Sequence, residues 1–286
     1  MKEQDFIDII KKQIGDEFLG DDCAYLKEFG IVVSQDSLIE DVHFKRKWCT
    51  PFQLGYKSIT VNISDILASG AKPAYLTIAL SLPDDIDDNF VKQFYSGAKS
   101  ALNGAKIIGG DITGGKYISV SVTAIGKTEG RRISSRSHAR AGYKVITRGE
   151  YGLSSAGLNA LVNGVKNEKL IRAHLEPKLD EDFSKSISEQ IQTDYAMMDT
   201  SDGLADALFK IAEASGLSIV SNEIQGMYGA EDYHLIAAVP EEFLKKLTNF
   251  YIVGEVVEKQ DFVLKIGHKE YKNYDELKLF DHFRRG

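Results

Sequence analysis

Aspartate side chains recur in this chain at the ends of apolar segments and beside glycines, where loops expose side chains. The segments that carry them are Gly20-Asp21-Asp22, Ser34-Gln35-Asp36, Asn62-Ile63-Ser64-Asp65, Gly109-Gly110-Asp111, Asp199-Thr200-Ser201-Asp202-Gly203 and Gly229-Ala230-Glu231-Asp232. A helix cap or a turn explains most of them one at a time. Asp65 differs, because it lies inside an otherwise apolar helical segment, on one stripe with Asn62 and Ser69. A carboxylate in such surroundings needs a cation or a hydrogen-bond network as its partner.

Carboxylates that converge in a fold create an electrostatic problem with few solutions. Two charges about 5 Å apart repel by roughly 3 kcal/mol at an effective dielectric constant of 20. Either some of the acids stay protonated or divalent cations lie among them. Oxygen ligands without sets of His or Cys favour Mg²⁺, Mn²⁺ or Ca²⁺ over zinc, and none of the 6 histidines pair at zinc-ligand spacing.

A phosphate-binding loop is the first alternative to examine. The segment from Gly110 to Lys116 matches G-x-x-x-x-G-K, but Tyr117 stands where the Mg²⁺-binding hydroxyl belongs, and the residues that follow alternate as in a strand. We therefore reject a P-loop. If the protein handles phosphates, metal ions would bridge its carboxylates to them, which is the logic of metal-assisted phosphoryl transfer.

The composition bounds the classes of protein that remain. The chain has 286 residues, a net charge of 35 − 42 = −7, 43% apolar residues and 2 Cys. No apolar run approaches the roughly 18 residues of a membrane span, and the first residues do not resemble a signal peptide. The acidic balance argues against a nucleic-acid partner. We expect a cytoplasmic protein without membrane or nucleic-acid partners.

Strand-like and helix-like segments alternate throughout, which predicts a mixed α/β (α+β) fold. We expect strands at 31–34, 74–82, 117–127, 143–147, 195–198, 233–239, 251–257 and 262–266, and helices at 54–69, 88–102, 153–165, 168–174, 182–191, 204–211 and 241–249. The basic, small-residue stretch 130–140 is the candidate boundary between two domains, 1–138 and 139–286.

The acidic segments described above, taken in their order along nearly the whole chain, resemble those of the thiamine-monophosphate kinase family. This family belongs to the aminoimidazole ribonucleotide synthetase superfamily. The resemblance also rests on Asp41-Val42-His43-Phe44, Gly70-Ala71-Lys72-Pro73, Glu231-Asp232-Tyr233 and Asp281-His282-Phe283. It implies ATP-dependent phosphorylation of thiamine phosphate to thiamine diphosphate, by direct in-line transfer assisted by several Mg²⁺ ions and without a covalent nucleophile. It also implies an N-terminal ATP- and metal-binding domain that pairs into a homodimer with a shared β-barrel, and a C-terminal α/β domain.

The resemblance assigns roles to individual positions of this sequence. Metal-binding positions are matched by Asp22, Ser34, Gln35, Asp36, Asp65, Asp111, Asp199 and Asp202. ATP-binding positions are matched by Gly110, Asp111, Arg136 and Ser201, and thiamine phosphate positions by His43, Glu231 and Phe280.

Some positions depart from the family pattern. Ala230 and His234 replace a Gly and a Glu, Gln35 stands where a small hydroxyl residue is common, and Ile112 breaks the usual Asp-Thr-Thr. None of these changes removes a matched carboxylate.

Two other hypotheses stay open on the sequence. One is another ATP-dependent enzyme of the superfamily, such as a purine-pathway synthetase or a selenide- or carbamoyl-type relative, although neither Cys23 nor Cys49 fits the reactive cysteine of such relatives. The other is a non-catalytic protein that binds nucleotides or divalent ions.

Overall fold

The first half of the chain forms an open five-stranded sheet in a computed structural model that describes residues 3–279. Its strand order is β1-β2-β5-β3-β4, and all neighbours are antiparallel except β3 and β4. The strands are β1 (Ala24–Leu26), β2 (Ile31–Ile39), β3 (Lys72–Leu82), β4 (Lys106–Gly114) and β5 (Ser119–Lys127).

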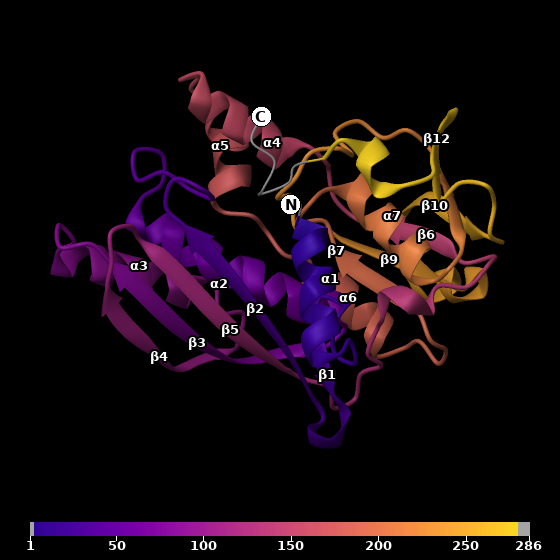
Figure 1. Ribbon diagram of the computed structural model, residues 1–286, viewed down its shortest axis with the longest axis horizontal. Helices are drawn as coiled ribbons and strands as arrows, with labels where there is room; N and C mark the ends of the chain where they lie inside the picture. Colours follow the sequence, from indigo (N-terminus) through magenta and orange to yellow (C-terminus); the bar gives the residue numbers. More distant parts are fainter. Residues whose placement is uncertain (1–2, 280–286) are drawn as a thin grey trace.

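The second half forms a seven-stranded mixed sheet in the order β12-β11-β8-β10-β6-β9-β7. Its strands are β6 (Lys144–Thr147), β7 (Ala196–Asp199), β8 (Ser218–Ser221), β9 (Leu235–Val239), β10 (Tyr251–Val257), β11 (Leu264–Ile266) and β12 (Lys269–Tyr271). The two sheets lie toward opposite ends of the molecule (Figure 1), and neither closes into a barrel within one chain.

The helices cover these sheets and fill the junction between them. They are α1 (Glu3–Ile14), α2 (Pro51–Ala68), α3 (Asp88–Ser100), α4 (Leu153–Val162), α5 (Glu168–Leu175), α6 (Glu181–Ser188) and α7 (Leu204–Ala214). Short 3₁₀ turns are η1 (Lys27–Phe29), η2 (Arg136–His138), η3 (Glu241–Lys246) and η4 (Tyr274–Leu277). No helix within residues 3–279 is both long and apolar enough to cross a bilayer.

Helix α2 is the central element of the fold. Thr50 and Gln53 form a reciprocal capping box at its start, and Pro51 follows the cap, where its missing N–H costs no hydrogen bond. The helix is buried nearly all round, against the first sheet, α3, α6 and β7. A single apolar core consequently runs from the N-terminal sheet across α2 to the second half, where it includes Ile146 and Met197.

Two glycines set the distance between α2 and α3. A Cβ atom on Gly55 would lie 1.9 Å from the Phe94 carbonyl oxygen, and one on Gly97 would lie 1.8 Å from that of Phe52. Only glycine permits this approach, so the two helices pack backbone to backbone.

Most of the predicted segments are present, and the mixed α/β fold is confirmed. The sequence analysis assigned no helix to α1 and no strand to β1, β4, β8 or β12, while the predicted helix at 241–249 is the 3₁₀ turn η3. Strand β4 is rich in glycine and exposed along its length, and it is a strand because β3 pairs with it in parallel. No alternation of apolar residues marks it, so local pattern could not reveal it.

Candidate functional site

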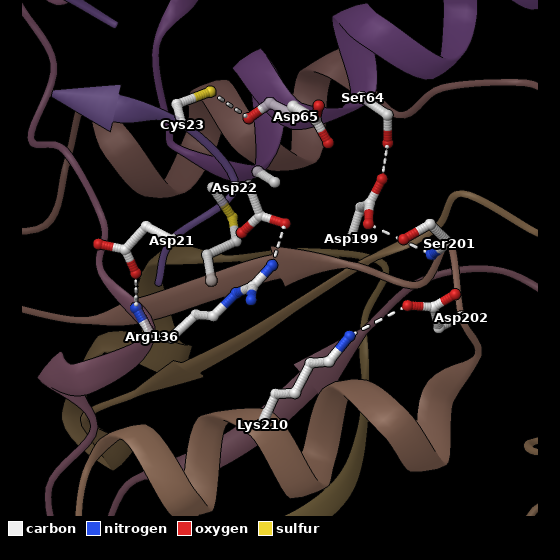
Figure 2. Close-up of polar contacts among 12 residues, drawn as sticks. Asp21, Asp22, Cys23, Ser64, Asp65, Arg136, Asp199, Ser201, Asp202 and Lys210 are labelled. Atoms are coloured by element: carbon white, nitrogen blue, oxygen red, sulfur yellow. Dashed lines mark hydrogen bonds and ion pairs between the residues drawn. The ribbon is translucent and has the colours of Figure 1, made fainter. Parts of the chain in front are cut away.

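Three carboxylates from distant parts of the chain meet at the junction of the two halves. Asp22 precedes β1, Asp65 lies on α2, and Asp199 is the last residue of β7. Each offers an oxygen atom, and these oxygens all lie within 4.8 Å of one another. Figure 2 shows the three side chains entering one space from their separate elements.

Hydrogen bonds fix the most buried of these acids, Asp199. The Ser64 hydroxyl donates to Asp199 Oδ2 at 2.5 Å, and the Ser201 backbone N–H donates to Oδ1 at 3.2 Å. Ser64 precedes Asp65 on α2, so one turn of helix both supplies a carboxylate and anchors another. The site is therefore built on rigid elements, which is what a precise ligand geometry requires.

Burial and nearby negative charges raise the pKa values of Asp65 and Asp199. The pKa of Asp65 lies well above its usual range because of burial and the nearby charges of Asp36, Asp199 and Asp22. That of Asp199 rises to about 7, mainly through burial and then through Asp22. The protein alone thus cannot ionise this cluster fully at neutral pH, whereas a divalent cation would stabilise the ionised form.

Arg136 is the one guanidinium that enters the cluster among the described residues, and it comes from η2 in the segment between the two sheets. Its NH2 group donates to Asp22 Oδ1 at 2.9 Å, and its backbone N–H donates to Asp21 Oδ1 at 2.7 Å. Its Nε is buried without a hydrogen-bond partner in residues 3–279. The Arg136 guanidinium therefore keeps an N–H donor that can bind an anion.

Further oxygen donors surround the three acids. The Asp36 backbone N–H donates to Asn62 Oδ1 at 3.0 Å, and this places the end of β2 beside α2. The pKa of Asp36 is raised by burial and by the charges of Asp202 and Asp22. Ser34 Oγ is buried and has no hydrogen-bond partner within the described chain. An orphaned hydroxyl beside clustered carboxylates suits a hard cation such as Mg²⁺.

Cys23 lies beside this cluster, but its thiol is not suited to binding metal. Its Sγ–H donates to the Asp65 carbonyl oxygen at 3.3 Å. Burial, with the charges of Asp65 and Asp22, holds the thiol pKa well above its usual value. The neutral thiol leaves the donor set to oxygen.

Lys210 on α7 borders the cluster on its other side. Its ammonium lies 3.0 Å from Asp202 Oδ2 and 3.0 Å from Asp206 Oδ2 (Figure 2 shows the first contact). Asp206 is buried and also accepts a hydrogen bond from the Tyr274 hydroxyl at 2.6 Å. Lys210 thereby ties Asp202 to a buried ion pair.

Known proteins resemble this chain in both sequence and fold. Residues 20–128 match the family model "AIR synthase related protein, N-terminal domain". The thiamine-monophosphate kinase of Aquifex aeolicus is 32% identical over 94% of this chain and 96% of its own. That of Bacillus subtilis is 33% identical over 78% of both chains. The chain belongs to the thiamine-monophosphate kinase family.

Solved structures of the family share the whole fold. The structure of AaThiL complexed with AMPPCP and TMP covers 99% of this chain with a TM-score of 0.88 and 30% sequence identity. The hydrogenase maturation protein HypE in complex with ATP shares the fold at 19% identity, with a TM-score of 0.64 over 80% of this chain.

The positions matched to the kinase family divide into two groups in the structure. Asp22, Asp65 and Asp199 converge, with Arg136 and Ser201 in direct contact with them. Asp36 and Asp202 adjoin the same region.

Gln35, Gly110 and Asp111 line a separate pocket of about 340 Å³ on the first sheet. The pairing register places Asp36, Val122 and Ile78 on the face that α2 covers, and Gln35 and Asp111 on the opposite face. The sequence analysis matched Asp111 and Gln35 to the same metal-binding set as Asp36, but their side chains lie outside the acid cluster of this chain. Because residues i and i+1 of a strand face opposite ways, Gln35 and Asp36 could not both enter it.

Of the positions matched to thiamine phosphate, His43 and Glu231 lie outside the group formed by Asp22, Asp65 and Asp199. His43 follows β2, and its Nδ1 accepts the Ile39 N–H at 3.0 Å. The Glu231 backbone N–H donates to the Ser201 carbonyl oxygen at 2.6 Å, which ties the Glu231 loop to the loop after Asp199. Phe280 lies outside the described residues.

Several residues of this region escaped the sequence analysis. Ser64 was quoted only as part of a motif, and Lys57, His174 and Lys210 were not considered. A lysine inside the apolar face of α2 was a usable signal for Lys57, since buried lysines need an acidic partner. Nothing local marked His174 or Lys210.

Proposed function

We propose that this protein is a thiamine-phosphate kinase, which transfers the terminal phosphoryl group of ATP to the phosphate of thiamine phosphate and yields thiamine diphosphate and ADP. The observation that carries the proposal is the cluster of Asp22, Asp65 and Asp199, with oxygens within 4.8 Å, in a chain of this family. AMPPCP is an analogue of ATP, and the relative that binds it together with TMP has nearly the same fold.

Asp22, Asp65 and Asp199 would hold Mg²⁺, with Asp36, Asp202 and Ser34 as further oxygen donors. Bound Mg²⁺ ions would neutralise phosphate charge and orient the oxygens of the attacking and leaving groups. The protein's own net charge of −7 cannot do this, and within residues 3–279 the one cationic side chain that contacts any of the three acids is Arg136, through Asp22. The Arg136 fork would grip a phosphate oxygen through its free donor.

The chain's own residues position the reactants and form no covalent bond with them. The thiol of Cys23 is protonated and turned toward a carbonyl, so it is not a nucleophile. Ser201 would contact ATP beside Asp199, and His43, Glu231 and Phe280 would contact thiamine phosphate. Direct in-line transfer follows, because the acceptor phosphate needs only alignment and charge neutralisation.

We propose in addition that the protein is a homodimer. Residues 1–138 would form the dimerising and ATP-binding domain, and residues 139–286 would form the second domain. Strand β4 pairs on one side only, and its Ile108 and Ile112 side chains are 57% and 64% exposed. An unpaired edge strand with exposed apolar side chains is a template for pairing with another chain. Two such edges would complete a shared barrel and bring Asp111 of each copy to the interface.

The cytoplasm is the compartment that we propose for this reaction. Cys23 and Cys49 are both buried and unpaired. Free thiols of this kind suit a reducing compartment.

The decisive test is ADP formation measured with a coupled assay. We expect ADP release from ATP only when thiamine phosphate and Mg²⁺ are both present, and thiamine diphosphate as the second product. Free thiamine is the control, since it lacks the acceptor phosphate. ADP release at the background rate with thiamine phosphate would refute the proposal.

A further inference from the structure

Glu231 is held in an unusual backbone conformation between β8 and β9. Its φ angle is +64°, in the left-handed region that residues other than glycine rarely adopt. Tyr233, two residues later, also has a positive φ, of +53°. Such conformations persist only where the surrounding structure fixes them, and they cluster at functional sites.

Two hydrogen-bonded contacts fix the backbone of this loop against the acid cluster. The Glu231 N–H donates to the Ser201 carbonyl oxygen at 2.6 Å. The His234 N–H donates to Thr200 Oγ1 at 3.1 Å, and the same hydroxyl donates to the His234 carbonyl oxygen at 3.0 Å. These hydrogen bonds therefore fix the position of the loop relative to the residues that follow Asp199.

The Glu231 side chain is fixed separately, by a buried cation. Lys57 on α2 places its Nζ 3.1 Å from Glu231 Oε1, and the Lys57 side chain is 3% exposed. The contact has ion-pair distance but not hydrogen-bond alignment, so Nζ remains without an aligned acceptor in residues 3–279. A buried ammonium in that position is stabilised by its partner's charge, and Glu231 forms its only ion pair in the described chain.

His174 on α5 contacts the other oxygen of the same carboxylate. Its Nδ1 lies 3.3 Å from Glu231 Oε2 and 3.0 Å from Ser154 Oγ. Burial and the Lys57 charge lower the pKa of His174 to about 4, so the imidazole is neutral at neutral pH. The neutral ring thus lies against Glu231 Oε2 without adding a charge, and the hydrogen bond between Nδ1 and the Ser154 hydroxyl fixes the ring.

We propose that Lys57 and His174 are positioning residues, which hold the Glu231 carboxylate in the orientation that binds thiamine phosphate. This inference rests on the proposed function. Neither side chain touches the substrate itself, since Lys57 and His174 are buried, whereas the Glu231 side chain is 25% exposed. Three elements thus converge on one carboxylate: α2, which also carries Asp65, α5, and the loop before β9.

The first test separates the Michaelis constants of the two substrates. Lys57→Met keeps the length of the side chain and removes its charge. We expect it to raise KM for thiamine phosphate about tenfold or more, while KM for ATP changes less than about twofold. Lys57→Arg keeps the charge and should recover part of the affinity. Lys92→Met, which breaks an exposed pair with Asp88 on α3, is the matched control and should behave as wild type.

A double-mutant cycle tests whether Lys57 acts through Glu231. Glu231→Gln should raise KM for thiamine phosphate by a similar factor, and Lys57→Met should add little in that background. Effects that multiply in the double variant would show that Lys57 acts independently and would overturn the inference. An unchanged KM for thiamine phosphate in Lys57→Met would overturn it as well.

A second pair of variants serves if Lys57→Met does not fold. His174→Asn keeps a polar side-chain amide near the position of Nδ1, and His174→Leu removes the polar contact. We expect the Leu variant to raise KM for thiamine phosphate and the Asn variant to restore it; equal values in both would contradict the role of His174. Wild-type protein without thiamine-phosphate-dependent turnover would refute the proposed function, whereas normal wild-type turnover with unaffected variants would refute only this inference.

Discussion

At the scale of residues, the site is a set of acids that the fold forces together. Asp65 and Asp199 lie on a buried helix and at the end of a buried strand, so neither can turn away into solvent. The resulting repulsion is tolerable only when protons or cations are bound. This predicts opposite effects of one substitution on stability and on activity.

Asp65→Asn tests that opposition. Removing one charge from the cluster relieves repulsion, so we expect the metal-free variant to unfold at or above the wild-type melting temperature. ADP formation should fall by at least about 100-fold, and the rise in Tm on adding Mg²⁺ should be smaller than in wild type. Asp88→Asn, on the surface of α3, is the control and should leave all three measurements unchanged. A variant that unfolds more readily yet keeps its turnover would assign Asp65 a structural role.

The raised pKa of Asp199 predicts a pH dependence of stability. Its pKa is about 7 in the folded state against an ordinary value of 3.8, so the folded state holds a proton that the unfolded state has lost. Its contribution to the free energy of unfolding therefore falls as pH rises from about 4 to about 7 and is constant above. By linkage the loss is on the order of a few kcal/mol without metal.

The measurement is the free energy of unfolding in urea for wild type and Asp199→Asn between pH 4 and 8. Comparison with the variant cancels groups that do not interact with Asp199, including His174, whose lowered pKa acts in the opposite direction. The variant should become the more stable protein as pH rises, and saturating Mg²⁺ should remove or reverse this advantage, because the wild-type site binds the ion more tightly. A difference that does not vary with pH would contradict the raised pKa.

At the scale of elements, the close contact of α2 with α3 positions the site. Asp65 lies near the end of α2, and the glycines at 55 and 97 allow the two helices to touch. Two of the misassigned segments, α1 and β4, are instead peripheral. Helix α1 does carry apolar residues at helical spacing (Phe6, Ile9, Ile10), a signal that the sequence analysis did not use, whereas β4 is an edge strand without apolar alternation.

Gly97→Ala should destabilise the protein. Its Cβ atom would lie 1.8 Å from the Phe52 carbonyl oxygen, which cannot move without shifting α2. We expect a loss of about 1–3 kcal/mol or more in the free energy of unfolding, despite the better helix propensity of alanine. Gly114→Ala, at an open position of β4, is the control and should change stability little. Equal stability of both variants would show that the helices can separate at no cost.

At the scale of the whole molecule, a single protomer does not bring all the positions matched to the kinase family together in one place. Asp111 and Gln35 face away from the acid cluster on the first sheet. The proposed homodimer would give these positions a context, because it would bury the open edge on which Asp111 lies.

Light scattering after gel filtration tests the dimer. We expect a mass of twice 31.7 kDa for wild type. Replacing both isoleucines with charged residues, as in the double variant Ile108→Glu with Ile112→Glu, should shift the protein toward the monomer and lower ADP formation. Ile14→Glu on α1, also exposed, should leave the mass unchanged. A wild-type monomer with full activity would contradict the dimer and leave the kinase proposal standing.

The sequence by itself determined the identity and order of the acidic segments, the mixed α/β class and the family. These follow from residue type, local periodicity and motif order, which need no knowledge of distant contacts. Only the tertiary structure decided which acids meet. Asp22, Asp65 and Asp199 lie in segments separated by up to 177 positions, and strand parity and packing on α2 select them while sending Asp111 to the other face. The contact of Glu231 with Lys57 and His174 was likewise decided only by the tertiary structure, because it forms where three separate elements pack together.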